Sequence, residues 1–92
     1  MKVKNKEFKE KQIGKDYRSV FLRSVKNASV EGMTVGQMKD LRSLIDKLEI
    51  EGTEIDLTKK EIETIKEKTR AIKWLVFNKE LIEMDEYLES LA

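Results

Sequence analysis

The clearest feature of the hydrophobic pattern is an apolar stripe that begins just after Thr58. Its members recur every three or four positions, the spacing of one face of an α-helix; they are Ile62, Ile65, Thr69, Ile72 and Val76. Thr58 and Glu61 form a capping-box pattern, in which each side chain accepts a hydrogen bond from the backbone amide of the other. The sequence therefore predicts a helix that begins near Thr58 and covers about residues 59 to 75.

Two further amphipathic helices are predicted upstream. In the first, Asp16 suits the N-cap and the helix ends near residues 27 to 29; its apolar positions are Tyr17, Val20, Phe21, Val25 and Ala28. In the second, Thr34 and Gln37 repeat the capping-box pattern, and the helix continues to about Glu49. Its apolar positions are Val35, Met38, Leu41, Leu44, Ile45 and Leu48.

The run from Trp74 to Phe77 is apolar on every side, since it reads Trp-Leu-Val-Phe. Such a run usually lies inside a core, so we expect it to be buried. Asn78 then suits the N-cap of a last helix, whose apolar positions are Leu81, Met84, Leu88 and Leu91. This spacing serves an internal core or a partner groove, and we favour the internal core.

The first fifteen residues show no helical stripe. Six of them are lysines, and only Val3, Phe8 and Ile13 are large and apolar. The alternation around Val3 fits a short edge strand and residues 12–15 fit a turn, so we interpret the segment as an extended arm or a weak hairpin. A second short extended segment is expected at residues 55–57.

Together these elements predict an all-α fold, a small bundle of three to four short helices with an extended basic N-terminal arm or short strand. We expect a basic arm at residues 1–15 and a single helical domain over 16–92. A chain of 92 residues has room for a modest core but not for a large enclosed substrate cavity. The expected core consists of Phe21, Leu41, Ile45, Leu48, Ile62, Ile65, Ile72, Trp74 and Leu88.

The composition argues against catalysis. The chain contains no His and no Cys, the residues that most readily supply a group titrating near neutral pH or an activated nucleophile. Acidic pairs in the last helix, Glu80 with Glu83 or Asp85 with Glu89, share a face and are the only candidates for a hard cation. A solvated acidic face explains them better, since no EF-hand pattern accompanies them. We therefore expect no enzyme, no cofactor and no metal.

Charge is distributed unevenly although the net charge is only +1. Residues 2–26 hold nine Lys or Arg and three acids, whereas residues 78–92 hold one Lys and five acids. In the interpretation that we favour, the basic arm lies near the acidic helix, in the same molecule or on a neighbouring copy. In the alternative it follows a nucleic-acid backbone, its cations being Lys2, Lys4, Lys6, Lys9, Lys11, Arg18 and Arg23.

The last helix carries acids where cations are preferred. Glu86 and Glu89 lie toward its C-terminus, the negative end of the helix dipole, so a cationic neighbour would stabilise them. We therefore expect partner contacts from both the arm and this helix. The residues expected to make them are Lys4, Lys6, Lys9, Lys11, Glu83, Glu86 and Glu89.

The stretch Leu57 to Lys66 reads Leu-Thr-Lys-Lys-Glu-Ile-Glu-Thr-Ile-Lys and follows a short extended segment and two predicted helices. In this order of elements the chain resembles a broad group of small accessory proteins of tailed phages and prophages. The resemblance implies an accessory or assembly protein and brings no catalytic residues with it. The Asp-Gly hairpin that such proteins often show near the N-terminus is absent here.

We therefore expect a non-enzymatic protein that binds a protein partner, or a second copy of itself, during assembly or regulation. The alternative function is a nucleic-acid-binding regulator that uses the basic arm. No stretch approaches the roughly 18 apolar residues of a membrane-spanning helix and no secretion signal is visible, so we expect no membrane contact. The expected location is the cytoplasm, or the virion if a phage encodes the chain.

Overall fold

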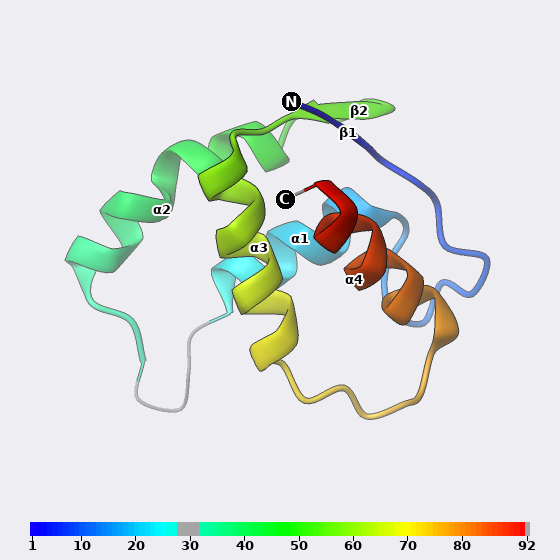
Figure 1. Ribbon diagram of the computed structural model, residues 1–92. Helices are drawn as coiled ribbons and strands as arrows, with labels where there is room; N and C mark the ends of the chain where they lie inside the picture. The colour runs from blue at the N-terminus through cyan, green and yellow to red at the C-terminus, as the bar shows by residue number, and fades with distance from the viewer. Residues whose placement is uncertain (28–31, 92) are drawn as a thin grey trace.

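The computed structural model describes residues 1–27 and 32–91. Its elements are β1 (Lys2–Lys4), α1 (Tyr17–Lys26), α2 (Val35–Leu48), β2 (Glu54–Asp56), α3 (Lys59–Ala71) and α4 (Lys79–Leu91). α1 lies at the centre and packs against α2 and α3, while α3 also packs against α4 (Figure 1). The described part of the chain is thus mainly helical, as expected. It is not purely α-helical, because β1 and β2 form a two-stranded sheet.

The two strands join the start of the chain to the segment that precedes α3. They pair antiparallel with Val3 opposite Ile55. Both of these side chains are buried, while their neighbours along each strand are exposed. The short strand predicted around Val3 is confirmed, and the expectation of an all-α fold is wrong in this respect. The reason is that each short segment supplies backbone hydrogen-bond partners that the other lacks alone.

The rest of the N-terminal segment is a tight loop that leads into α1. The Phe8 amide donates to the Lys15 carbonyl at 3.1 Å, and the Tyr17 amide donates to the Lys6 carbonyl at 3.0 Å. Of the two interpretations left open for residues 1–15, the weak hairpin therefore describes these contacts. Val3, Phe8 and Ile13 of this segment are all buried.

The helices begin where the capping residues predict. Asp16, Thr34, Thr58 and Asn78 each accept a hydrogen bond on a side-chain oxygen from a backbone amide two or three residues later. At Thr34 and Thr58 the reciprocal half of the capping box is also made. These caps satisfy amides that the first turn of a helix leaves without a partner. Positions 28 and 29, included in the first predicted helix, lie outside the described residues.

One hydrophobic core connects all six elements. Its buried members are Val3, Phe8, Ile13, Tyr17, Val20, Phe21, Val25, Leu44, Leu48, Ile55, Leu57, Ile62, Ile65, Met84 and Leu88. Of the residues expected in the core, five are fully buried, namely Phe21, Leu48, Ile62, Ile65 and Leu88. Leu41, Ile45 and Trp74 are partly buried against it. Ile72 is half-buried and lies outside this cluster, because α3 has ended before it.

The end of α3 differs from the prediction. The helix ends at Ala71 rather than near residue 75, and Ile72 is already extended. The apolar run that follows is not buried, since Leu75 is fully exposed, Phe77 is 80% exposed and Val76 is 49% exposed. The expectation of a buried run is therefore wrong for these three residues.

The N-terminal loop gives a physical reason for this difference. Phe8 packs on Tyr17 of α1, with ring centroids 5.4 Å apart, and the adjacent Lys9 amide is bonded to Glu80 of α4. The core space between α1 and the start of α4 is thus filled from the other end of the chain. The segment that joins α3 to α4 is left at the surface.

α2 contributes to the core mainly through its second half. Leu44 and Leu48 are buried, whereas Val35 and Met38 are exposed although they lie on the apolar face of the predicted helix. Figure 1 shows the first half of α2 extending away from α1 and α3. The first turn of α2 therefore lies outside the core.

Candidate functional site

The N-terminal segment lies along α4, as the favoured interpretation of the charge pattern expects within one molecule. The Lys4 amide donates to the Tyr87 hydroxyl at 2.9 Å, and the Lys9 amide donates to a Glu80 carboxylate oxygen at 2.9 Å. Both contacts use the backbone, so the two lysine side chains remain exposed. The hydrogen bond from the Lys9 amide lowers the pKa of Glu80.

Three of the seven predicted contact residues meet at a hollow between this segment and α4. The hollow has a volume of about 610 Å³, and its lining includes Lys4, Lys6, Glu83, Tyr17 and Tyr87. The two tyrosine rings lie 6.2 Å apart. Burial, reinforced by the Glu83 charge, raises the pKa of Tyr17, so its hydroxyl stays neutral at physiological pH. The hollow thus offers charges of both signs and aromatic surface.

The other predicted contact residues are spread along the surface. Lys9 lies next to Glu80, and the Lys11 ammonium is 3.8 Å from the Glu7 carboxylate. Glu86 is exposed on α4. The structure therefore does not assemble all seven residues into one site.

Glu89, the last of the seven, belongs to an ion cluster that joins α3 to α4. Arg70 donates two hydrogen bonds to Asp85, at 2.8 and 3.1 Å, and a third to Glu89 at 2.8 Å. Lys66 reaches the same Glu89 oxygen at 3.1 Å. These bonds lower the pKa of both carboxyl groups and raise the pKa of both cations. The cationic neighbour expected for the C-terminal half of α4 thus comes from the same molecule.

A second feature, missed at the level of sequence, is the exposed run at residues 74–77, which we call the apolar segment. It joins α3 to α4 (Figure 1) and is irregular, with bends at Leu75 and Val76. Leu75 and Phe77 are among the most exposed large apolar side chains of the described residues, and Ile82, near the start of α4, is also exposed. Burying one such side chain stabilises by about 1.5–3 kcal/mol.

One end of the apolar segment is held to the body of the protein. The Arg23 guanidinium stacks over the Trp74 ring at 5.0 Å from its centroid. Trp74 also lines a shallow hollow of about 270 Å³ together with Ile72, Leu81 and Met84. Trp74 therefore anchors the segment, while the next three residues face solvent.

The sequence did contain a signal for this exposure. Asn78 caps α4 directly after the run, so the run has no room to form a helical turn of its own. Lysines at 73 and 79 stand on either side of it. A short apolar run closed off by a cap and flanked by cations is typical of a connecting loop, and loops lie at the surface.

Comparisons with protein families, with curated proteins and with solved structures returned no match. Within residues 1–27 and 32–91, no three His, Cys, Asp or Glu side chains are placed to hold a metal ion. None of the helices in this part of the chain has the length and apolar content needed to cross a bilayer.

Proposed function

We propose that this chain is a non-enzymatic accessory protein that binds a protein partner, or a second copy of itself, in an assembly or a regulatory complex. The observation that carries the proposal is the exposure of the apolar segment. Such a role agrees with the resemblance to small phage accessory proteins.

The energetics of the apolar segment favour a docked partner. Leu75 is fully exposed and Phe77 is nearly so, and Ile82 near the start of α4 is also exposed. Apolar surface removed from water contributes roughly 25 cal/mol per Å². Contiguous exposed apolar residues with a polar rim are typical of interaction sites. Protein interfaces place such anchors at their centre and charged residues at the edge.

The nucleic-acid alternative gains less support. A phosphate-binding arm needs cations free of nearby carboxylates, but Lys9 and Lys6 lie close enough to Glu80 to lower its pKa. Lys11 is paired with Glu7. The basic segment is thus partly neutralised by the molecule itself.

The test is a capture experiment with the full chain as bait in nuclease-treated lysate of its source cells. It compares the wild type with the double variant Leu75→Ser/Phe77→Ser. The matched control is Val35→Ser/Met38→Ser, which removes exposed apolar side chains from α2 instead. A partner that binds through the apolar segment is expected with wild type and control and is lost with the double variant.

Direct titration of the purified partner then measures the effect. We expect the double variant to bind at least about tenfold more weakly, since a tenfold change corresponds to about 1.4 kcal/mol and two anchors are removed. Equal binding by all three proteins would contradict the proposal. Capture that disappears on nuclease treatment and on Lys4→Gln/Lys6→Gln substitution would instead establish the nucleic-acid alternative.

A further inference from the structure

The hollow between the N-terminal segment and α4, which we call the tyrosine hollow, contains a polar group that the fold does not use. Its volume of about 610 Å³ lies within the range of small-molecule sites, roughly 300–1,000 Å³. Its lining includes residues of β1, β2, α1 and α4, so the hollow exists only once the chain has folded.

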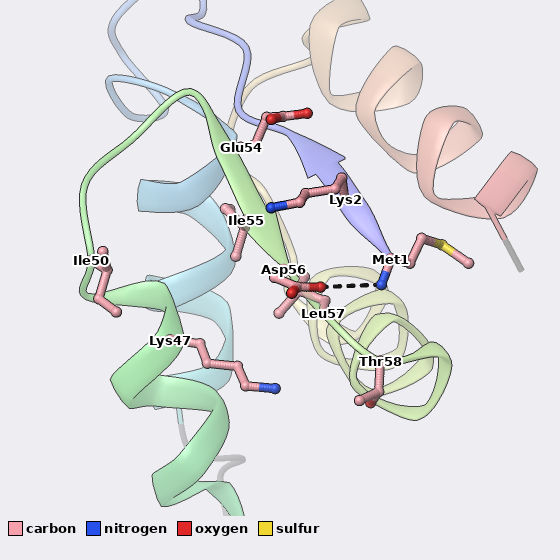
Figure 2. A pocket seen from close by; sticks show the side chains of 9 residues that line it. All are labelled: Met1, Lys2, Lys47, Ile50, Glu54, Ile55, Asp56, Leu57 and Thr58. Atoms are coloured by element: carbon pink, nitrogen blue, oxygen red, sulfur yellow. Dashed lines mark hydrogen bonds and ion pairs between the residues drawn. The ribbon is translucent and has the colours of Figure 1, made fainter.

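A second hollow, of about 450 Å³, lies where the strands meet the end of α2 (Figure 2). Among the described residues that line it there is no aromatic ring. Two of its cations are already paired within the molecule, because the terminal amino group is 3.2 Å from Asp56 and the Lys47 ammonium is 2.8 Å from Glu61. The tyrosine hollow is therefore the better candidate for a ligand site.

The group that points to a ligand is the Tyr17 hydroxyl. Tyr17 is 5% exposed, and its side chain contacts the rings of Phe8, Phe21 and Tyr87. Within residues 1–27 and 32–91 its hydroxyl has no hydrogen-bond partner, although most buried polar groups are bonded. The oxygen is not sealed inside the core, so it opens onto the hollow that Tyr17 lines.

Two neighbouring polar side chains of the lining are already bonded within the protein. The Tyr87 hydroxyl accepts a hydrogen bond from the Lys4 amide at 2.9 Å. The Asn5 side chain uses its nitrogen and its oxygen in three hydrogen bonds. The Tyr17 hydroxyl differs from both, because the fold leaves it open to another molecule.

The charged groups of the tyrosine hollow are balanced in number but separated in space. Lys4 and Lys6 come from the N-terminal segment, while Glu83 comes from α4 and Glu54 from β2. None of the four forms an ion pair within the described residues. A zwitterion matches such a lining, because it offers an opposite charge to both the lysines and the glutamates.

The position of the acids decides which end of a zwitterion lies beside Tyr17. Burial raises the pKa of Tyr17, and the charges of Glu83 and Glu80 raise it further. The hydroxyl is therefore neutral at physiological pH, and the potential around it is negative. An ammonium group is favoured there, since the hydroxyl oxygen and the Glu83 carboxylate both accept hydrogen bonds.

The other end of a zwitterion then lies beside the N-terminal segment. The Lys4 and Lys6 side chains are exposed, and either ammonium group can bind a carboxylate. Between the two ends are the rings of Tyr17 and Tyr87, whose centroids are 6.2 Å apart. Aromatic rings pack favourably against one another, so an aromatic ligand body suits this surface.

We infer that the tyrosine hollow binds a free amino acid with an aromatic side chain, its ammonium group held by Tyr17 and Glu83 and its carboxylate by Lys4 or Lys6. This inference goes beyond the proposed partner contact, which uses the apolar segment instead. Because the ligand would contact the N-terminal segment, α1 and α4 together, its binding should also raise the melting temperature.

The test is a titration of ¹⁵N-labelled protein, followed by NMR, with three probes that share a phenyl ring. L-phenylalanine carries both charges, phenethylamine lacks the carboxylate, and 3-phenylpropionate lacks the ammonium group. L-phenylalanine should bind most tightly and should shift the backbone amide signals of Lys4, Lys6 and Tyr87, which line the hollow.

Two variants test the ammonium end. Tyr17→Phe removes a hydroxyl that the fold does not use, so it should keep the wild-type circular dichroism and at least the wild-type melting temperature. It should weaken the binding of L-phenylalanine and phenethylamine about tenfold. Glu83→Gln should weaken the same two probes by about twofold to fivefold, since Glu83 is exposed. Neither variant should weaken the binding of 3-phenylpropionate.

A third variant tests the carboxylate end. Lys4→Gln/Lys6→Gln should weaken L-phenylalanine and 3-phenylpropionate by about twofold to fivefold and should not weaken phenethylamine. The matched controls are Glu86→Gln on α4 and Lys9→Gln/Lys11→Gln on the N-terminal segment, because these residues do not line the hollow. Both controls should bind all three probes as the wild type does.

Three results would overturn the inference. They are no shift with L-phenylalanine up to its solubility limit, equal affinity for L-phenylalanine and either analogue with a single charge, and unchanged binding by Tyr17→Phe. None of these results bears on the apolar segment, which is tested by Leu75→Ser/Phe77→Ser, so failure here leaves the proposed function standing.

Discussion

Residues 1–15, which include β1, and residues 72–78 both lie outside the helices, yet their apolar side chains are placed in opposite ways. The first is rich in lysine and buries Val3, Phe8 and Ile13, while the second is mostly apolar and exposes three of its large apolar side chains. Local hydrophobicity therefore does not decide which segment enters the core. Position along the chain does, because the N-terminal segment is tied on both sides by backbone hydrogen bonds to β2 and α1.

The exposed segment differs in what holds it. Arg23 and the Asn78 cap fix its two ends, but the residues between them have no core to enter. A segment of this kind is free to serve a contact without cost to the fold. The comparison predicts that stability depends on the first segment and association on the second.

The largest expected effect separates two phenylalanines. Phe8→Ala should lower the free energy of unfolding by about 3–5 kcal/mol, because it leaves a cavity in a close-packed core. Phe77→Ala should change it by no more than about 0.5 kcal/mol, since the ring is mostly exposed. Urea unfolding followed by circular dichroism, at a concentration where the protein is monomeric, measures both. Similar losses for the two variants would show that the segments do not differ as described.

A smaller effect is expected at the two caps that follow the segments. Asp16 is buried and accepts from the Ser19 amide and hydroxyl and from the Asn5 side chain, so it fixes both α1 and the N-terminal segment. Asp16→Ala should cost about 2–3 kcal/mol, and Asn78→Ala, which removes a cap alone, about 1 kcal/mol. The melting temperatures of the two variants, measured by thermal unfolding, show which substitution costs more stability. A larger loss for Asn78→Ala would mean that the segment before α4 is also fixed by its cap.

The smallest expected effect is on how stability depends on pH in acid, and it arises from the ion cluster that joins α3 to α4. Hydrogen bonds from Arg70 and Lys66 lower the pKa of Asp85 and Glu89 in the folded state. Their stabilisation is therefore complete above the unfolded pKa values of about 4 and is lost as the pH falls through the lower folded values.

Replacing the shared cation tests this dependence. Arg70→Gln should lower the melting temperature slightly at neutral pH and make the fall of the melting temperature below pH 4 shallower. The control is Lys68→Gln, because the Lys68 side chain forms no ion pair in the described residues. This control should keep the wild-type dependence of melting temperature on pH. Melting curves across this pH range compare the three proteins. Identical acid profiles for wild type and Arg70→Gln would show that the cluster adds nothing to stability.

Much of the fold could be predicted from local chemistry. Asp16, Thr34, Thr58 and Asn78 act through contacts within three residues, so the sequence alone locates the start of each helix. The short strand around Val3 was also readable from its alternation. What it pairs with was not, because that partner lies more than fifty residues away.

The candidate surfaces likewise combine features that the local sequence predicts with features that depend on distant parts of the chain. Lys4, Lys6 and Glu83 were chosen by charge, and the fold brings them to one hollow. Glu89 was chosen by the same reasoning, but in the fold its carboxylate is paired with Arg70 of α3. The exposure of Phe77 has a local signal in the Asn78 cap that directly follows it, but it also depends on how the far end of the chain fills the core.

The most direct test of the contact proposed for the apolar segment uses Trp74, the only tryptophan of the chain, which lies next to the exposed residues. Its fluorescence emission is measured as the protein is diluted from millimolar to nanomolar concentration. If a second copy covers the segment, emission is blue-shifted at high concentration and moves to longer wavelength on dilution, and Phe77→Ser shows no such change. An emission maximum that is independent of concentration, or that shifts equally in Phe77→Ser, would contradict a self-association surface at residues 74–77.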